Sequence, residues 1–301
     1  SMNTLFLTPL WQRAWLSTLG HNYDPILLAL RREDQLIGIA PLAHSEGTIT
    51  FLGDTNLFDY QDFVVRDGNE EYFYQTLVEY LGREEWQNLE FPSLREDSPT
   101  TKLLPGFARD RGWTVHLALQ DVSPRITLSP TWDEYLAGLS KKDRHELRRK
   151  FRRLDNQAWH RRYSCRDTDN LVEAANSLFK LMRGGTDAKR QFLTPKREEF
   201  FNAIIAETAR AEMLKLYFLE IGGERVAAAL CFDYAGSRFL YNSGFNATYS
   251  SLSVGLLVKA FSLQEAIQDQ LKHYDFLRGD EHYKYQLGAT RKAIYRLCIT
   301  R

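Results

Sequence analysis

The chain has 301 residues, of which 44% are hydrophobic and 26% charged, and its 39 Lys and Arg residues balance its 39 Asp and Glu residues. This length suits two domains of ordinary size, and the composition is typical of a globular protein and excludes a disordered one. The formal net charge of zero excludes a molecule-wide attraction to nucleic acid or to an anionic membrane, so any such binding has to be local.

The cysteines and the hydropathy pattern indicate the compartment. Cys165, Cys231 and Cys298 are far apart, and each lies in an apolar or alternating run, which favours buried free thiols in a reducing environment. No apolar stretch approaches the ~20 residues that a membrane span requires, and the chain does not begin with a basic segment followed by an apolar one. We therefore expect a cytoplasmic protein with no membrane span and no DNA partner.

The first half alternates helices with short strands. Pro9 opens a helix over residues 10–19, in which Trp11 and Trp15 share one face and are expected core anchors. A hairpin pattern at 26–30 and 36–42 follows, and a third strand at 48–52 completes a meander. The remaining expected elements are a strand at 63–65, a helix at 70–81, a strand at 87–91 that closes into Pro92, a helix at 99–109 and a strand at 113–119.

Residues 128–159 differ in kind, because they predict two consecutive helices. The segment 129–131 opens the first helix, and Ser140 caps a second one that runs to about residue 156. This organisation predicts an N-terminal domain at 2–128, a helical linker with a basic face at 129–159 and a C-terminal domain at 160–301.

The second half repeats much of the plan of the first. Strands are expected at 161–166, 214–221, 226–234, 238–241, 274–277 and 293–299, and helices at 169–182, 195–211 and 252–271. Residues 26–53 and 216–244 share one succession of strand, polar turn, strand, glycine-containing turn and strand. That shared plan predicts a structural duplication with little residue identity.

Three segments carry a family resemblance beyond this order of elements: residues 139–149 (LSKKDRHELRR), 253–257 (SVGLL) and 275–284 (DFLRGDEHYK). Together they resemble the cellulose-biosynthesis-associated, CelD-type acetyltransferases of the GNAT superfamily, a family that is similar to the Fem-type tandem transferases. The resemblance extends to the first half through Gly53 and the Asp-Tyr pair at 59 and 60. It implies an α/β fold with mixed sheets, in which two tandem GNAT-like acyl-CoA N-acyltransferase domains are joined by a helical hairpin.

The resemblance implies an acyl-CoA donor, bound as a co-substrate, with its pyrophosphate at a helix start. A helix N-terminus offers unpaired N–H groups and a favourable dipole to an anion. The expected donor-binding residues are Ser250, Ser251, Ser253, Val254 and Gly255. The usual superfamily loop carries a basic residue and two glycines, whereas here Gly255 stands alone, so the same residues also fit a helix cap without a ligand.

The expected catalytic residues directly follow the strand at 274–277. Amide formation from a thioester requires a base for the attacking ammonium and an acid for the departing thiolate. Glu281 or Asp280 is the expected base and Tyr283 the expected acid, while Lys284 is expected to stabilise the oxyanion or bind an anionic substrate group.

Further residues are expected to contact substrate. Asp275 and Arg278 precede the expected catalytic residues. With Asp280 they also fit a local ion-pair cluster that fixes the turn while Tyr283 packs. Asp59 and Tyr60 form a polar loop, for which an ordinary Asx-turn is the alternative.

The basic segment 141–153 predicts a helix with a cationic face. On that face, Lys141, Arg144 and Arg148 are candidate contacts to an anionic donor or acceptor, and a solvated helix is the alternative.

The function that follows is transfer of an acyl group, most simply acetyl, from acyl-CoA to an amine of a small molecule or of an envelope or polysaccharide precursor. A hydroxyl acceptor is an alternative, as are a Fem-like transferase that uses aminoacyl-tRNA and a non-catalytic binding module. The seven histidines show no metal-ligand spacing with the cysteines, and hydrolase, nucleotide-kinase and dehydrogenase motifs are absent. We therefore expect no metal and no tightly bound cofactor.

Overall fold

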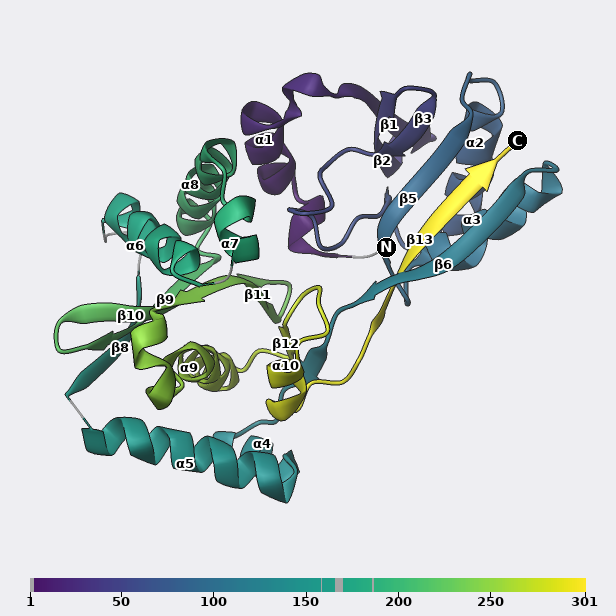
Figure 1. Cartoon of the computed structure of the whole chain (residues 1–301). Coiled ribbons are helices and arrows are strands. Elements are labelled where there is room, and N and C mark those ends of the chain that lie inside the picture. Colours follow the sequence, from purple (N-terminus) through teal and green to yellow (C-terminus); the bar gives the residue numbers. More distant parts are fainter. Residues whose placement is uncertain (1–2, 158, 166–169, 186) are drawn as a thin grey trace. The chain divides into compact units, whose positions relative to one another are not determined.

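The computed structural model describes residues 3–157, 159–165, 170–185 and 187–301. The chain divides into two compact units, the first formed by Ser1–Val122 with Lys292–Arg301 and the second by Ser123–Arg291. In Figure 1 the first unit is purple to blue with a yellow strand, and the second is teal to yellow.

The first unit is a mixed sheet covered by helices. Its elements are η1 (Leu5–Leu7), α1 (Pro9–Thr18), η2 (Gly20–Asn22), β1 (Asp24–Arg32), β2 (Gln35–Ser45), β3 (Thr48–Phe51), β4 (Val64–Val65), α2 (Glu70–Leu81), β5 (Asn88–Arg95), α3 (Pro99–Asp110), β6 (Thr114–Val122) and β13 (Ala293–Thr300). The strand order is β1-β2-β3-β5-β13-β6, with β3 and β5 parallel. Residues of α2 and α3 form one apolar cluster with the inward side chains of the strands.

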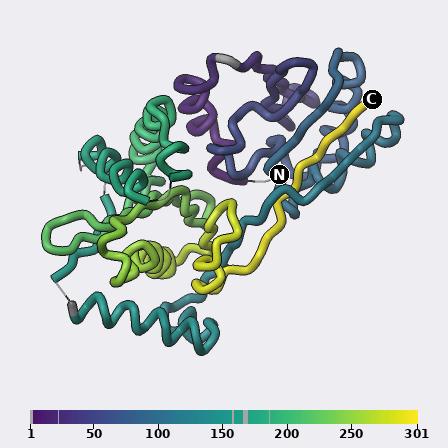
Figure 2. The backbone as a smooth tube through the Cα atoms, viewed as in Figure 1, coloured from purple at the N-terminus to yellow at the C-terminus, as the bar shows by residue number. Residues whose placement is uncertain are grey.

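The final strand is present as predicted, but it does not belong to the predicted C-terminal domain 160–301. Instead of joining the second sheet, β13 pairs antiparallel with both β5 and β6. The tube in Figure 2 lets the reader follow the yellow C-terminal segment between these two strands. Leu297 and Ile299 are fully buried in the first unit's apolar cluster, which is the driving force for this pairing.

Strand β5 is longer than predicted, because it passes through Pro92 to Arg95. The ladder with β13 is irregular here: Phe91 pairs with Leu297 and Leu94 with Tyr295, which leaves Pro92 and Ser93 in a bulge. A bulge is one of the few places where a strand tolerates proline.

The second unit repeats this architecture. Its elements are β7 (Arg125–Thr127), α4 (Trp132–Gly138), α5 (Lys141–Gln157), β8 (His160–Cys165), α6 (Leu171–Arg183), α7 (Asp187–Phe192), α8 (Pro195–Arg210), β9 (Leu214–Ile221), β10 (Glu224–Tyr234), β11 (Ser237–Phe245), η3 (Ala247–Leu252), α9 (Val254–Gln268), β12 (His273–Asp275) and α10 (His282–Gln286). The strand order is β7-β12-β11-β10-β9-β8. Residues 166 and 169, where a predicted strand ends and a predicted helix begins, lie outside the described residues.

The two helices predicted as a separate linker at 129–159 belong to the second unit. Leu136 and Leu139 of the α4 region and Leu147 and Leu154 of α5 are buried in the same apolar cluster as α9. Ser140 caps α5 as predicted, because its Oγ accepts the Asp143 N–H at 3.1 Å.

The predicted duplication is confirmed by the two sheets. The order β9-β10-β11-β12-β7 in the second matches β1-β2-β3-β5-β13 in the first, and in each the third and fourth of these strands are parallel.

Candidate functional site

The second sheet opens between β11 and β12. These parallel strands pair at three positions, ending with Phe239 opposite Asp275, whereas β11 continues to Phe245. Phe276 turns away, since its N–H donates to Pro124 O at 3.0 Å. On β11, Leu240 pairs with Cys231 and Asn242 with Leu230, so Tyr241 forms a bulge where the strands part. We call the gap beyond these last pairs the strand split.

Helix α9 starts after β11 and η3, and two cationic side chains of α5 reach the residues just before it. Lys150 Nζ lies 3.0 Å from Ser253 Oγ, and Arg153 donates to Ser251 O at 2.8 Å. Ser253 is left-handed, with φ of 56°, and makes no side-chain cap. The first N–H groups of α9 lack intrahelical partners, and the helix dipole is positive here. Two cations and a helix start therefore surround one small surface, and Glu146 of α5 pairs with Lys150 there at 3.0 Å.

Of the other four predicted donor residues, two are exposed and two are buried. Ser250 and Ser251 are exposed, which is compatible with contact to a ligand, whereas Val254 and Gly255 are buried. A Cβ on Gly255 would lie 2.7 Å from the ring of Phe245. Packing against Phe245 therefore explains this glycine without a phosphate.

The predicted cationic face of α5 is not the one that reaches α9. Lys141 and Arg148 are exposed, and Arg144 donates to Ala137 O at 3.1 Å. Lys150 lies instead on the packed face, one helical turn after Leu147 and one turn before Leu154. Lys150 was not among the predicted contacts, because those were chosen from the solvent-facing stripe of the helix.

The loop after β12 is fixed by two buried charged residues. Asp275 Oδ1 accepts the Leu277 N–H at 2.9 Å and the Ser123 hydroxyl at 3.1 Å. Lys284 is 1% exposed, and its Nζ donates to the carbonyls of residues 277, 278 and 279 at 3.0, 2.9 and 3.0 Å. An ammonium has three N–H groups. Lys284 therefore holds the loop, and in this geometry it has no N–H left for the predicted oxyanion role.

The two carboxylates predicted as the base are both engaged. Glu281 Oε2 lies 2.8 Å from Lys284 Nζ, and its side chain is 56% exposed. Asp280 accepts a hydrogen bond from the hydroxyl of Tyr285. Both carboxylates are therefore held by partners within their own segment.

Tyr283, the predicted acid, lies beside a lysine that sequence reasoning missed. Lys259 of α9 is 8% exposed, donates to Gly255 O at 2.9 Å and has its Nζ 4.6 Å from the Tyr283 ring centroid. Burial, followed by the charge of Lys189, lowers the pKa of Lys259 to about 7, while burial raises the pKa of Tyr283. Lys189 itself donates to Ser243 O on β11, beyond the last β11–β12 pair.

A signal for Lys259 was present in the sequence. It is the one charged residue between positions 254 and 263 of an otherwise apolar helix. A charged residue on a buried helix face is rare unless it is paired or functional.

The candidate residues of the first unit have structural partners. Tyr60 is 2% exposed, with the Arg95 guanidinium 5.3 Å from its ring centroid, and Asp59 beside it is half-buried. In the same segment, buried Asp62 accepts hydrogen bonds from the hydroxyls of Ser98 and Thr100, and burial raises its pKa to about 6.

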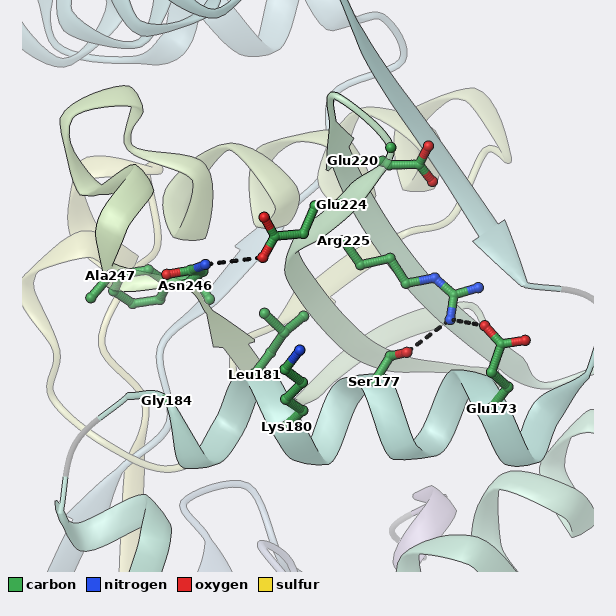
Figure 3. A pocket seen from close by; sticks show the side chains of 12 residues that line it. Glu173, Ser177, Lys180, Leu181, Gly184, Glu220, Glu224, Arg225, Asn246 and Ala247 are labelled. Carbon is green, nitrogen blue, oxygen red and sulfur yellow. Dashed lines mark hydrogen bonds and ion pairs between the residues drawn. The ribbon is translucent and has the colours of Figure 1, made fainter.

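A groove of about 770 Å³ lies between α6, the β9–β10 turn and the end of β11. Figure 3 shows Arg225 reaching from β10 to Ser177 and Glu173 on α6, at 2.9 and 3.0 Å. Glu224 likewise accepts from Asn246 at 3.2 Å. Because these polar groups bind one another, the groove does not indicate a reaction. It shows only which elements surround the end of β11.

Comparisons with known proteins agree with this geometry. Residues 141–285 match the family model "Acetyltransferase (GNAT) domain". No curated protein sequence matches the chain. The fold is similar to the crystal structure of FemX, with a TM-score of 0.68 and 11% identity over 98% of this chain and 92% of that one.

Two further structures are similar over most of the chain. L-PGS from Bacillus licheniformis has a TM-score of 0.62 and 11% identity, covering 98% of this chain and 92% of its own. A tandem GNAT protein from the clavulanic acid biosynthesis pathway has a TM-score of 0.52 and 11% identity, covering 94% and 85%.

The predicted fold class, two tandem GNAT-like domains with mixed sheets, is therefore confirmed. The narrower resemblance to the CelD-type family stays a prediction. Within the part of the chain that the structure describes, no helix is both long and apolar enough to cross a membrane.

Proposed function

We propose that the second unit transfers an acyl group, most simply acetyl, from an acyl-CoA thioester to an amine. One observation carries this proposal. In the second unit β11 and β12 separate, and α5 places Lys150 at the start of α9. The match of residues 141–285 to a GNAT acetyltransferase domain supports it independently.

The donor would bind in two parts. Its pyrophosphate would lie at the start of α9, where the helix dipole, Lys150 and Arg153 favour negative charge. Ser250 and Ser251 are exposed at the same place. The thioester arm would enter the strand split, and Tyr283, on α10 after β12, would be the proton donor for the leaving thiolate.

The acceptor is proposed from the resemblance alone. An amine of a small molecule or of an envelope or polysaccharide precursor fits the CelD-type assignment, and a hydroxyl is the alternative nucleophile. The tandem arrangement is shared with FemX and L-PGS, so a Fem-like transferase that uses aminoacyl-tRNA is the second candidate. The observation that favours it is the row of exposed cations on α5: Lys141, Lys142, Arg148 and Arg152.

The test is a thermal-shift comparison of acetyl-CoA, longer acyl-CoAs, CoA and deacylated tRNA. A ligand at ~100 times its Kd should add about 2.7 kcal/mol to the free energy of unfolding. The absence of a shift with every CoA species at millimolar concentration would overturn the proposal. A salt-sensitive shift with tRNA instead would support the second candidate, and no shift with either would support a non-catalytic binding module.

A pair of variants locates the donor. Lys150→Gln should weaken acetyl-CoA binding about 10-fold, since it removes a charge at the proposed phosphate position. Lys141→Gln, an exposed cation on the same helix, is the matched control and should leave the acetyl-CoA affinity unchanged. Equal affinities for the two variants would contradict the placement of the pyrophosphate.

A further inference from the structure

Lys259 is the most unusual buried group of the second unit. Lys259 lies in the middle of α9 and is 8% exposed, and among the described residues its ammonium donates one hydrogen bond, to the carbonyl of Gly255 at 2.9 Å. Removing a charged lysine from water is costly unless it is paired, so a lysine in such a place is either paired, uncharged or functional.

Titratable groups from α7, α10 and β10 surround Lys259. Lys189 of α7, Lys284 of α10, Glu281 at the start of α10 and Cys231 of β10 act on it electrostatically, and the Tyr283 ring centroid lies 4.6 Å from its Nζ. Glu281 is ion-paired with Lys284 at 2.8 Å, which leaves little negative charge to hold a proton on Lys259. Cys231 stays a neutral thiol at physiological pH, since burial raises its pKa to about 12. The surroundings of Lys259 therefore favour its uncharged amine.

The position of Lys259 suits a proton acceptor in the proposed reaction. Its Nζ lies over the ring of Tyr283, so the proposed acid and this amine are neighbours. Lys189 binds the Ser243 carbonyl of β11, which places a second member of the cluster against the strand edge beyond the last β11–β12 pair. The cluster thus lies where the proposed function puts the thioester.

We propose that Lys259 is the base of the acyl transfer, in place of Glu281 or Asp280, with Tyr283 beside it as the acid. This inference rests on the proposed function. The acceptor ammonium gives one proton to Lys259 Nζ, and the resulting amine attacks the thioester carbonyl, so that a C–N bond forms and the C–S bond breaks. The thiolate takes a proton from the Tyr283 hydroxyl. The nitrogen's second proton restores Tyr283, and Lys259 releases its proton to solvent, which balances the reaction.

The first experiment needs no acceptor and no donor. The Nζ resonance that Lys259→Met removes from the NMR spectrum of ¹⁵N-lysine-labelled protein is followed from pH 5 to pH 11. Exposed Lys180 of α6 is the internal reference. The inference requires Lys259 to titrate near neutral pH, well before Lys180. Joint titration of the two lysines above about pH 10, the ordinary range for lysine, overturns it.

The second experiment measures CoA thiol released from acetyl-CoA, with glucosamine or ethanolamine as acceptor, from pH 5.5 to pH 9. Lys259→Met should lower the rate at least about 100-fold and abolish its rise near pH 7, as expected for loss of a general base. The acetyl-CoA thermal shift should be unchanged, and Lys180→Met should behave as the wild type. Arginine stays protonated, so Lys259→Arg should not restore the rate.

The outcomes separate the two proposals. A wild-type protein that neither binds acetyl-CoA nor releases thiol refutes the proposed function, and the base role with it. A wild type that is active and a Lys259→Met variant with the same rate and pH profile refute the base role alone. A thermal midpoint for Lys259→Met at or above the wild-type value shows that loss of rate is not loss of fold.

Discussion

In the first unit β3 and β5 are parallel over three residue pairs, as β11 and β12 are in the second. The continuation differs. After β11 the chain forms η3 and then α9 directly, whereas after β3 it makes a loop and strand β4 before α2 begins at Glu70. In the second unit a helix therefore begins soon after the strand that borders the strand split. In the first unit the helix begins only after a loop and β4.

Side chains increase this difference. In the first unit Phe51 of β3 and Phe91 of β5 both contact Phe63, with ring centroids 5.0 and 5.4 Å from it. In the second unit, Lys259 of α9 and Tyr283 of α10 are neighbours, with the Lys259 Nζ 4.6 Å from the Tyr283 ring centroid. Aromatic packing fills a space that a ligand would otherwise need. The comparison favours the second unit as the holder of the donor, and the following predictions test it.

The largest expected effect is on the loop of the second unit. Lys284→Met leaves three carbonyls without their buried donor and should lower the free energy of unfolding by about 3 kcal/mol. Urea denaturation measures this loss. Glu281→Gln is the control and should cost less than about 1 kcal/mol, since the Glu281 carboxylate is 56% exposed and the three carbonyls still hold the Lys284 ammonium. A loss of similar size in both variants would mean that the carbonyl bonds do not stabilise the loop.

A smaller, pH-dependent effect is expected in the first unit. Burial raises the pKa of Asp62 to about 6, so the folded state binds this proton more tightly than the unfolded chain does. The free energy of unfolding should therefore fall as the pH rises from about 4 to about 6, and this contribution should be level above that range.

Asp62→Asn cannot ionise and should remove about 2 kcal/mol of that fall, measured by urea denaturation at pH 4 and pH 7. Exposed Asp110→Asn is the control and should keep the wild-type pH dependence. An unchanged pH dependence in Asp62→Asn would show that the Asp62 carboxyl is not the group that titrates.

The smallest effect contrasts two left-handed residues, one in the bulge of β5 and one in the loop after β12. Ser93 and Leu277 both have left-handed backbones, with φ of 60° and 57°. The Ser93 hydroxyl is buried, with no hydrogen-bond partner among the described residues. Ser93→Gly should raise the thermal midpoint by an amount equivalent to about 1 kcal/mol, because it removes both strain and an unsatisfied group. Leu277→Gly should lower it, because the 2% exposed side chain loses its burial. A lowered midpoint for Ser93→Gly would contradict this account.

Local patterns predicted the elements well where apolar periodicity and caps agree. The helix at 70–81 and the strand at 214–221 have the predicted bounds, and Ser140 caps α5. Strand pairing at long range was not predictable. The alternation of apolar and polar residues at 293–299 indicates which face of the strand is buried, but it does not indicate which sheet the strand joins. The bulge at Pro92 was missed for a related reason, since it depends on the register with β13.

The sequence indicates where the expected catalytic residues lie in the fold, whereas their roles stay a prediction. The 275–284 string does form the strand exit, and its motif placed Tyr283 there. The buried bonds of Lys284 and the approach of Lys259 and Lys150 depend on how α5, α9 and α10 pack together. Sequence spacing within one helix carries no information on such distances between helices.

The location of β13 has a consequence for synthesis of the protein. Strands β5 and β6 flank β13, so each keeps an open edge until residues 293–300 emerge from the ribosome, after residues 123–292 have been made. The second unit has all of its strands by then, and long-range pairing is slow to form. We therefore expect the second unit to fold first during translation, while the nascent first sheet carries exposed edges that chaperones would have to shield.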